Sequence, residues 1–201
     1  MSVQLDDNQR LALDQLKSGS ILCGGVGSGK SRTALAYFTL KECGGTLDGG
    51  MMKHPKDLYI ITTAKKRDSK EWEDEFPPFP FADISIKIDS WNNIGKYAEI
   101  TDALFIFDEQ RLVGSGAWVK AFLKIAKCNN WILLSATPGD TWMDYIPVFI
   151  ANGFYKNRTQ FLRRHVVYSR YAKFPKVDHY VETGRLLRLR KAILVNMKYV
   201  K

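Results

Sequence analysis

The chain has 201 residues, of which 45% are hydrophobic, and it carries a formal net charge of +9 at pH 7. This length provides the core of one sizeable α/β domain and is too short for two full domains. No apolar run approaches the roughly 20 residues of a membrane span, and the polar, acidic N-terminus is unlike a secretory signal. Three widely spaced cysteines without a C-x-x-C pair indicate a reducing compartment and no metal site. We therefore expect a cytoplasmic protein with no membrane partner.

The positive charge is concentrated in the last quarter of the chain. Residues 151–201 contain 13 Lys and Arg but only 2 Asp and Glu, whereas residues 1–150 are close to neutral. Such asymmetry is typical of proteins that bind a polyanion such as DNA. A solvated basic surface without a partner is the alternative.

Hydrophobic periodicity predicts helices and strands in alternation along the chain. The first helix is expected at residues 6–16, where Asp6 and Gln9 have the spacing of a capping box. Further helices are expected at 32–40, 70–76 and 117–127, and strands at 21–23, 58–62, 84–88, 104–107 and 131–134. After Pro138 the pattern is helical and basic. Because the strands are continuously apolar and separated by helices, we predict an α/β fold with a mostly parallel central sheet and helices on both faces.

The segment from Gly24 to Ser31 fits the phosphate-binding loop pattern G-x-x-x-x-G-K-[ST], between a predicted strand and a predicted helix. Its glycines let successive backbone N–H groups point at a phosphate, and the helix N-terminus adds partial positive charge. Lys30 can reach the β- and γ-phosphates, and the Ser31 hydroxyl can ligate Mg²⁺. The alternative is a chance match in a glycine-rich turn. We predict ATP and Mg²⁺ as cofactors, with nucleotide contacts from Gly24, Gly25, Val26, Gly27, Ser28, Gly29, Lys30, Ser31 and Arg32.

Two further polar segments follow the fourth and fifth predicted strands. Asp108 ends an apolar strand, where the second Mg²⁺ anchor is expected, and Glu109 is then the general base for the attacking water. Lys30, Asp108 and Glu109 are therefore the predicted catalytic residues, although an acidic pair that caps the next helix is the alternative. Ser135-Ala136-Thr137 follows the fifth strand, at the edge where open α/β sheets bind ligands.

The order of these segments resembles the first RecA-like domain of superfamily-two helicases and translocases. It is most similar to the Swi/Snf-type and DEAD/DEAH-related helicases carried by bacteriophages. The resemblance covers essentially the whole chain and is carried by Gln9, Gly24–Ser31, Thr62-Thr63-Ala64, Asp108-Glu109-Gln110-Arg111 and Ser135-Ala136-Thr137. It implies a RecA-like P-loop NTPase core at residues 1–150. Residues 151–201 would be a basic helical extension of the same domain, leading to a missing second RecA-like domain.

The resemblance also implies roles for single residues. Gln9 would read the adenine edge, although a helix-capping role fits it as well. Gln110, Ser135, Ala136 and Thr137 would couple the ATP state to strand binding, and Gln110 departs from the D-E-A-D and D-E-A-H patterns. Trp72 would pack rather than stack on a base. Nucleic acid would be contacted by Thr62, Thr63 and Ser90, although a turn is the alternative at Ser90. Independently of the resemblance, the charge of residues 151–201 predicts phosphate contacts from Arg163 and Arg164.

The resulting hypothesis is an ATP-binding motor domain of a DNA helicase or translocase. Its partners would be single- or double-stranded DNA bound without sequence preference, the second RecA-like domain and, as further candidates, phage replication proteins in the host cytoplasm. The isolated domain would be nearly inactive, because an arginine finger from the second domain is missing. The alternatives are a small-molecule P-loop kinase, an AAA-type or other P-loop ATPase, and a non-catalytic nucleic-acid-binding module.

Overall fold

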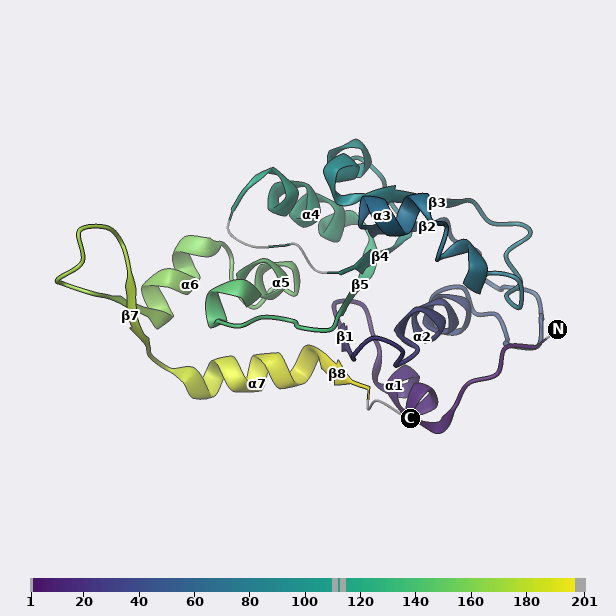
Figure 1. The fold of residues 1–201 in the computed structure, drawn as a ribbon, viewed down its shortest axis with the longest axis horizontal. Coiled ribbons are helices and arrows are strands. Elements are labelled where there is room, and N and C mark those ends of the chain that lie inside the picture. Colours follow the sequence, from purple (N-terminus) through teal and green to yellow (C-terminus); the bar gives the residue numbers. More distant parts are fainter. Residues whose placement is uncertain (1, 110–111, 113–114, 198–201) are drawn as a thin grey trace.

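A six-stranded parallel sheet forms the centre of the computed structural model, which describes residues 2–109, 112 and 115–197 (Figure 1). The strands stand in the order β3-β2-β4-β5-β1-β8, and every neighbouring pair is parallel. Their bounds are β1 Ile21–Cys23, β2 Leu58–Thr62, β3 Ile86–Ser90, β4 Leu104–Asp108, β5 Asn130–Ser135 and β8 Leu194–Asn196. The predicted α/β fold with a parallel central sheet is confirmed.

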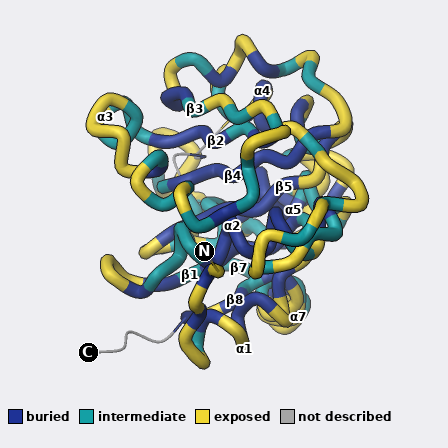
Figure 2. Tube along the Cα trace, turned by 90° about the vertical axis from the view of Figure 1, so that its right-hand side faces the viewer, coloured by how far each residue is buried: buried dark blue, intermediate teal, exposed yellow. Residues whose placement is uncertain are grey.

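Helices cover both faces of this sheet. One face is covered by α1 (Asp7–Gln15), α2 (Lys30–Tyr37) and the π-helical turn Phe38–Glu42; the other by α4 (Ala117–Cys128), α5 (Ile146–Ala151), α6 (Arg158–His165) and α7 (Thr183–Ile193). Successive residues of β4 supply the two cores alternately, as the pleat of a strand requires. Leu104 and Ile106 face α1 and α2, whereas Phe105 and Phe107 face the other layer. Figure 2 shows the central strands as the buried part of the chain.

Two local elements differ from the prediction between residues 63 and 90. The short helix expected at 70–76 is replaced by α3 (Ala64–Asp68) and a 3₁₀ turn at Glu73–Glu75. The Thr63 side chain caps α3 by accepting from the Lys66 N–H at 3.2 Å, and α3 has no apolar stripe that periodicity could detect. Strand β3 also begins two residues later than expected.

The C-terminal part is not purely helical, contrary to the prediction for residues 151–201. An antiparallel hairpin of β6 (Val166–Tyr168) and β7 (Val177–Tyr180) follows α6 and projects away from the sheet (Figure 1). Strand β8 then pairs with β1 in the central sheet. Three-residue strands such as β6 and β8 are too short for a periodic signal to separate them from the helices beside them. In the described part of the chain no helix is both long and apolar enough for a membrane span.

The register of the sheet brings polar residues from several strands to one edge. Thr62 lies opposite Ser90, Asp108 opposite Leu134, and Cys23 opposite Ser135. All of these residues except Leu134, which precedes the last residue of β5, end their strands. In a parallel sheet the carboxyl ends lie on the same side. This edge is where open α/β sheets bind ligands.

Beneath this edge, the side chain of Phe107 is fully buried among Trp91, Phe122 and Trp131. We expect Phe107→Ala to lower the free energy of unfolding by about 3–5 kcal/mol, because the surrounding rings cannot close the cavity. Equilibrium urea denaturation measures this change. The matched control is Phe174→Ala, at a side chain that is 69% exposed, which should change stability by no more than about 0.5 kcal/mol. Equal effects of the two substitutions would contradict the burial described.

Candidate functional site

The loop between β1 and α2 requires its glycines for shape. Gly27 and Gly29 have φ of 80° and 85°, in the left-handed region that favours glycine. A Cβ on Gly24 would lie 2.6 Å from Ser28 Oγ and 3.2 Å from Met197 Cβ, so the loop packs there without room for a side chain. Gly25 faces open space, and Val26 is 89% exposed on the rim.

Lys30 begins α2 and folds back across the loop. Its ammonium group donates to the carbonyl of Gly24 and, at 3.1 Å, to that of Gly25. Partial burial lowers the pKa of Lys30, and Asp108 across the site opposes that shift. The loop therefore presents a cation beside its curled backbone.

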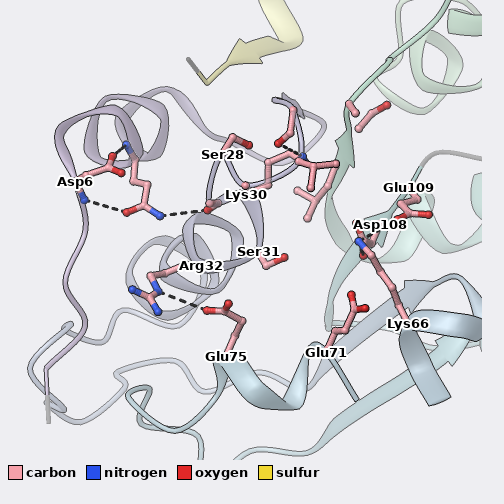
Figure 3. Close-up of a pocket in the computed structure, with 18 of the residues that line it drawn as sticks. Asp6, Ser28, Lys30, Ser31, Arg32, Lys66, Glu71, Glu75, Asp108 and Glu109 are labelled. Atoms are coloured by element: carbon pink, nitrogen blue, oxygen red, sulfur yellow. Dashed lines mark hydrogen bonds and ion pairs between the residues drawn. The ribbon is translucent and has the colours of Figure 1, made fainter. Parts of the chain in front are cut away.

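Two serine hydroxyls complete the loop. Ser28 is buried, and its Oγ has no hydrogen-bond partner among the described residues. Ser31 lies in the first turn of α2, and its hydroxyl points into the cleft toward the side that carries Asp108 (Figure 3). A buried polar atom without a partner normally belongs to a site that receives a ligand or water.

Gln9 joins helix α1 to the loop. Its Oε1 accepts from the Asp6 N–H at 2.9 Å, and the Gln9 N–H donates to Asp6 Oδ1 at 2.8 Å, which confirms the capping box. Its Nε2 donates to the carbonyl of Gly29 at 3.3 Å. One N–H and one lone pair of the amide remain for other contacts, so adenine recognition stays a prediction.

Asp108 lies at the end of β4, almost fully buried. Its Oδ2 accepts three hydrogen bonds, from Thr62 Oγ1 at 2.9 Å, Trp72 Nε1 at 2.9 Å and Lys66 Nζ at 3.2 Å. The indole of Trp91 donates to the main-chain oxygen of Asp108 at 2.9 Å. These donors fix the carboxylate at the edge of the sheet and offset the cost of burying its charge.

Lys66 connects the two adjacent carboxylates. Its Nζ lies 3.0 Å from Glu109 Oε1 as well as 3.2 Å from Asp108 Oδ2. Burial alone would lower the pKa of Lys66, but the charges of Asp108 and Glu109 outweigh it and raise the pKa. Glu109 has a φ of 57°, a conformation that strains a residue with a Cβ by roughly 1–2 kcal/mol. Such strain is commonly found at functional sites.

These groups line one cleft with a volume of about 1060 Å³. The phosphate loop forms one wall, and Lys66, Asp108 and Glu109 lie on the opposite side, with Glu71 and Glu75 between them (Figure 3). Arg32, a predicted nucleotide contact, forms an ion pair with Glu75 at 3.4 Å.

The Ser135-Ala136-Thr137 segment closes the cleft beside the loop. The Ser135 carbonyl accepts from the Gly24 N–H at 3.2 Å, and its hydroxyl accepts from the Thr137 N–H at 3.0 Å. Ser135 is buried, whereas Ala136 and Thr137 are exposed at the cleft. Gln110, the fourth predicted coupling residue, lies outside the described residues.

The predicted nucleic-acid residues are not brought together. Thr62 and Ser90 are buried, and the Thr62 hydroxyl donates to Asp108, so its side chain lies inside the protein rather than on a surface. Arg163 and Arg164 are exposed on α6, and Arg164 pairs with Glu182 at 2.7 Å. The nucleic-acid role of Thr63, Arg163 and Arg164 stays a prediction.

Sequence reasoning missed four residues of the site: Lys66, Trp72, Glu71 and Glu75. Lys66 follows the end of β2 by four residues, and the carboxyl end of β2 lies at the same edge as that of β4. Because the carboxyl ends of all strands in a parallel sheet lie at one edge, the predicted strand at 58–62 already marks Lys66 as a candidate. No local pattern indicates that the indole of Trp72, a residue expected only to pack, donates to Asp108.

Asp89 at the end of β3 anchors the helix that carries Lys66. Its Oδ1 accepts from Arg67 Nη1 at 3.0 Å and from Asn93 Nδ2 at 2.8 Å, and its Oδ2 accepts from the hydroxyl of Tyr97. Burial alone would raise the pKa of Asp89, but these hydrogen bonds hold it well below its usual range. Helix α3 is therefore fixed to the sheet by a carboxylate that is ionised at neutral pH.

Comparisons with known proteins place the fold. The sequence matches no known family profile and no curated protein. The structure is similar to the helicase domain of Hef from Pyrococcus furiosus, with a TM-score of 0.50 and 15% identity, over 81% of this chain and 40% of that one. The ATPase DotB of Legionella pneumophila matches with a TM-score of 0.39 and 16% identity, over 80% and 40%. The parallel sheet and the similarity to the Hef domain show a RecA-like α/β fold. The chain spans 40% of the length of either matched chain.

We expect Asp89→Asn to lower the free energy of unfolding by about 1.5–3 kcal/mol at pH 7, because charge-assisted hydrogen bonds are lost. A depressed pKa stabilises the fold above the unfolded value of about 3.9, and this contribution is lost as the pH falls through the folded value. The difference between wild type and variant should therefore be constant from pH 6 to 8 and shrink below about pH 4. Urea denaturation across this range measures it.

Asp83→Asn is the control, because Asp83 lies exposed in the turn before β3. It should change stability by less than about 0.5 kcal/mol at either pH. An Asp89→Asn difference that stayed constant down to pH 2 would show that the ionised carboxylate does not stabilise α3.

Proposed function

We propose that this chain is the ATP-binding motor domain of a nucleic-acid helicase or translocase, and that the cleft binds Mg–ATP. One observation carries the proposal: the phosphate loop with Lys30 faces the buried Asp108 and the strained Glu109 across a single cleft. Phosphoryl transfer from ATP to water needs a loop that holds the phosphates. It also needs an acidic pair, of which one residue binds Mg²⁺ and the other activates the water. The RecA-like fold is compatible with the proposal without carrying it.

The loop suits the phosphates of a nucleotide. The N-terminus of α2 directs backbone N–H groups and partial positive charge into the cleft. Lys30 donates to two loop carbonyls, and it can exchange these neutral acceptors for phosphate oxygens that carry charge. The buried Ser28 hydroxyl can donate to an oxygen placed inside the loop.

The donor set also suits Mg²⁺, a hard cation that prefers oxygen ligands. The Ser31 hydroxyl and the Asp108 carboxylate would hold it from opposite sides of the cleft. Among the described residues no cluster of three or more His, Cys, Asp or Glu could hold a metal by itself, which fits a cation bound largely through substrate phosphates. When bound, Mg²⁺ would neutralise charge that develops on the β- and γ-phosphates.

Glu109 would accept the proton of the attacking water. Its side chain is 43% exposed and reaches the cleft beside Asp108. The Lys66 ammonium, 3.0 Å from Glu109 Oε1, orients the Glu109 side chain, while Thr62 and Trp72 keep Asp108 in place. Water attack on the γ-phosphorus would thus release its proton to a carboxylate that is already positioned.

Coupling to nucleic acid is the part of the proposal that distinguishes a motor from another ATPase. The Ser135 carbonyl accepts from the Gly24 N–H, so a movement of Ser135-Ala136-Thr137 would displace the backbone of the phosphate loop at Gly24. The basic C-terminal quarter offers a surface for DNA phosphates. A second RecA-like domain would supply the remaining contacts, and phage replication proteins are candidate partners. The alternatives remain an AAA-type or other P-loop ATPase and a non-catalytic nucleic-acid-binding module.

We expect Lys30→Ala to abolish Mg–ATP binding in isothermal titration, because Arg32 and Lys66, the other described cations of the cleft, are paired with carboxylates and do not replace its charge at the γ-phosphate. Lys87→Ala, at an exposed position of β3 outside the cleft, is the control with the same change of charge. It should bind Mg–ATP as the wild type does. Equal affinities of wild type and Lys30→Ala would refute the assignment of the loop.

We expect Glu109→Gln to retain Mg–ATP binding and to slow hydrolysis by about 10²-fold or more, the usual contribution of a general base. The wild-type chain should itself turn over slowly, since an arginine supplied in trans is worth ~10³–10⁵ in rate. Single-turnover release of labelled phosphate detects such rates. Glu99→Gln, at an exposed position outside the cleft, controls for the change of charge. Unchanged hydrolysis in Glu109→Gln would give the base another identity.

A further inference from the structure

The hairpin after α6 ends in a tip that differs from the rest of the surface. The tip consists of residues 169–176, with the sequence Ser-Arg-Tyr-Ala-Lys-Phe-Pro-Lys. Tyr171 is 96% exposed and Phe174 is 69% exposed. Within the described residues, the Phe, Tyr and Trp side chains that are exposed all belong to this hairpin: Tyr168, Tyr171 and Phe174. Exposed apolar groups that gather on one element are a feature of binding surfaces, whereas single ones are common on any protein.

The tip is also strongly basic. Arg170, Lys173 and Lys176 are exposed, and the tip contains no acidic residue. The acidic residues of the segments beside it already have basic partners, because Glu182 pairs with Arg164 and Asp178 contacts His179. Three positive charges thus alternate along eight residues with two exposed rings.

The hairpin is held firmly by its base. His165 ends α6 and is fully buried, its Nδ1 bonding to the carbonyl of Val181 at 2.9 Å and its Nε2 to the hydroxyl of Tyr155 at 2.5 Å. The Val181 N–H donates back to the His165 carbonyl at 2.8 Å. At the other end, the Ser169 N–H donates to the Lys176 carbonyl at 2.7 Å and closes the tip. The tip is therefore presented on a paired stem away from the sheet, as Figure 1 shows.

We propose that the hairpin tip is a binding site for single-stranded nucleic acid, an inference that deepens the proposed motor function by naming its substrate and the residues that contact it. Tyr171 and Phe174 stack on exposed bases, while Arg170, Lys173 and Lys176 contact the phosphates between them. Alternating rings and cations match a strand whose bases and phosphates also alternate. A duplex exposes its phosphates to the cations of the tip. Its bases are stacked inside, so they are not available to Tyr171 and Phe174.

The composition of the tip favours nucleic acid over a protein partner. Lysine is depleted at protein–protein interfaces, and charged residues are depleted at their cores. Here two lysines flank the exposed Phe174, where such a core would lie. All the cations of the tip can pair with the successive phosphates of a polyanion, whereas an apolar protein groove would leave them without partners.

The test uses one double variant that carries both Tyr171→Ala and Phe174→Ala. Its binding to labelled oligo-dT, labelled oligo-rU and a labelled duplex is compared with that of the wild type by fluorescence anisotropy, without nucleotide. We expect single-strand affinity to fall roughly 5- to 100-fold per ring and duplex affinity to stay unchanged. Tyr171→Phe combined with Phe174→Tyr keeps both rings and should bind as the wild type does. Met51→Ala is the control, because Met51 is 90% exposed and lies outside the hairpin. Loss with both oligo-dT and oligo-rU supports the proposal, and a loss confined to one names the nucleic acid.

Unchanged single-strand affinity in the alanine variant, with an unchanged unfolding midpoint, overturns the proposal. An equal loss on single strand and duplex also overturns it, because stacking would then not be the contact. If the alanine variant instead loses self-association in light scattering while DNA binding stays, the tip is a protein-docking surface. Titration of the same proteins with Mg–ATP separates the two proposals, since failure of the cleft to bind nucleotide leaves the DNA result standing.

Discussion

The structure around the cleft depends on one buried charge, the carboxylate of Asp108. A carboxylate with almost no exposed surface is stable only when donors replace the water it has lost. Its three donors come from different places: Thr62 from the end of β2, Lys66 from α3, and Trp72 from the segment after α3. Satisfying this single group therefore fixes where the whole segment after β2 must lie, and with it the position of Lys66 against Glu109.

The features that could be predicted from the sequence are those set by local interactions. The phosphate loop is recognisable because its glycines meet conformational demands within eight residues, and Asp6 with Gln9 forms the expected cap. The parallel sheet followed from apolar runs separated by helices. The bonds to Asp108 could not be predicted, since they join residues 36 to 46 positions apart. The hairpin was missed because its strands, Val166–Tyr168 and Val177–Tyr180, are too short to show a periodic signal.

Within the site, the two halves differ in how tightly they are held. Asp108 and Asp89 are each surrounded by several donors, so the acidic side is rigid before any ligand arrives. Lys30, in contrast, bonds to carbonyls of its own loop, which are neutral acceptors. A preorganised acidic side and an adjustable basic side suit a site in which the anion is the group that enters and leaves.

The packing of Gly24 has a consequence for how the protein is made. Its neighbour Met197 comes from the far end of the described chain, and the Met197 N–H donates to the Cys23 carbonyl at 2.7 Å, beside the pairing of β8 with β1. During synthesis the ribosome delivers β1 and its loop well before β8, because β2 to β7 and all the helices after α1 lie between them in the chain. Until then β1 has an open edge, a state that invites mispairing with other chains. The phosphate loop, which precedes most of the sheet in the chain, is thus completed only when β8 pairs with β1.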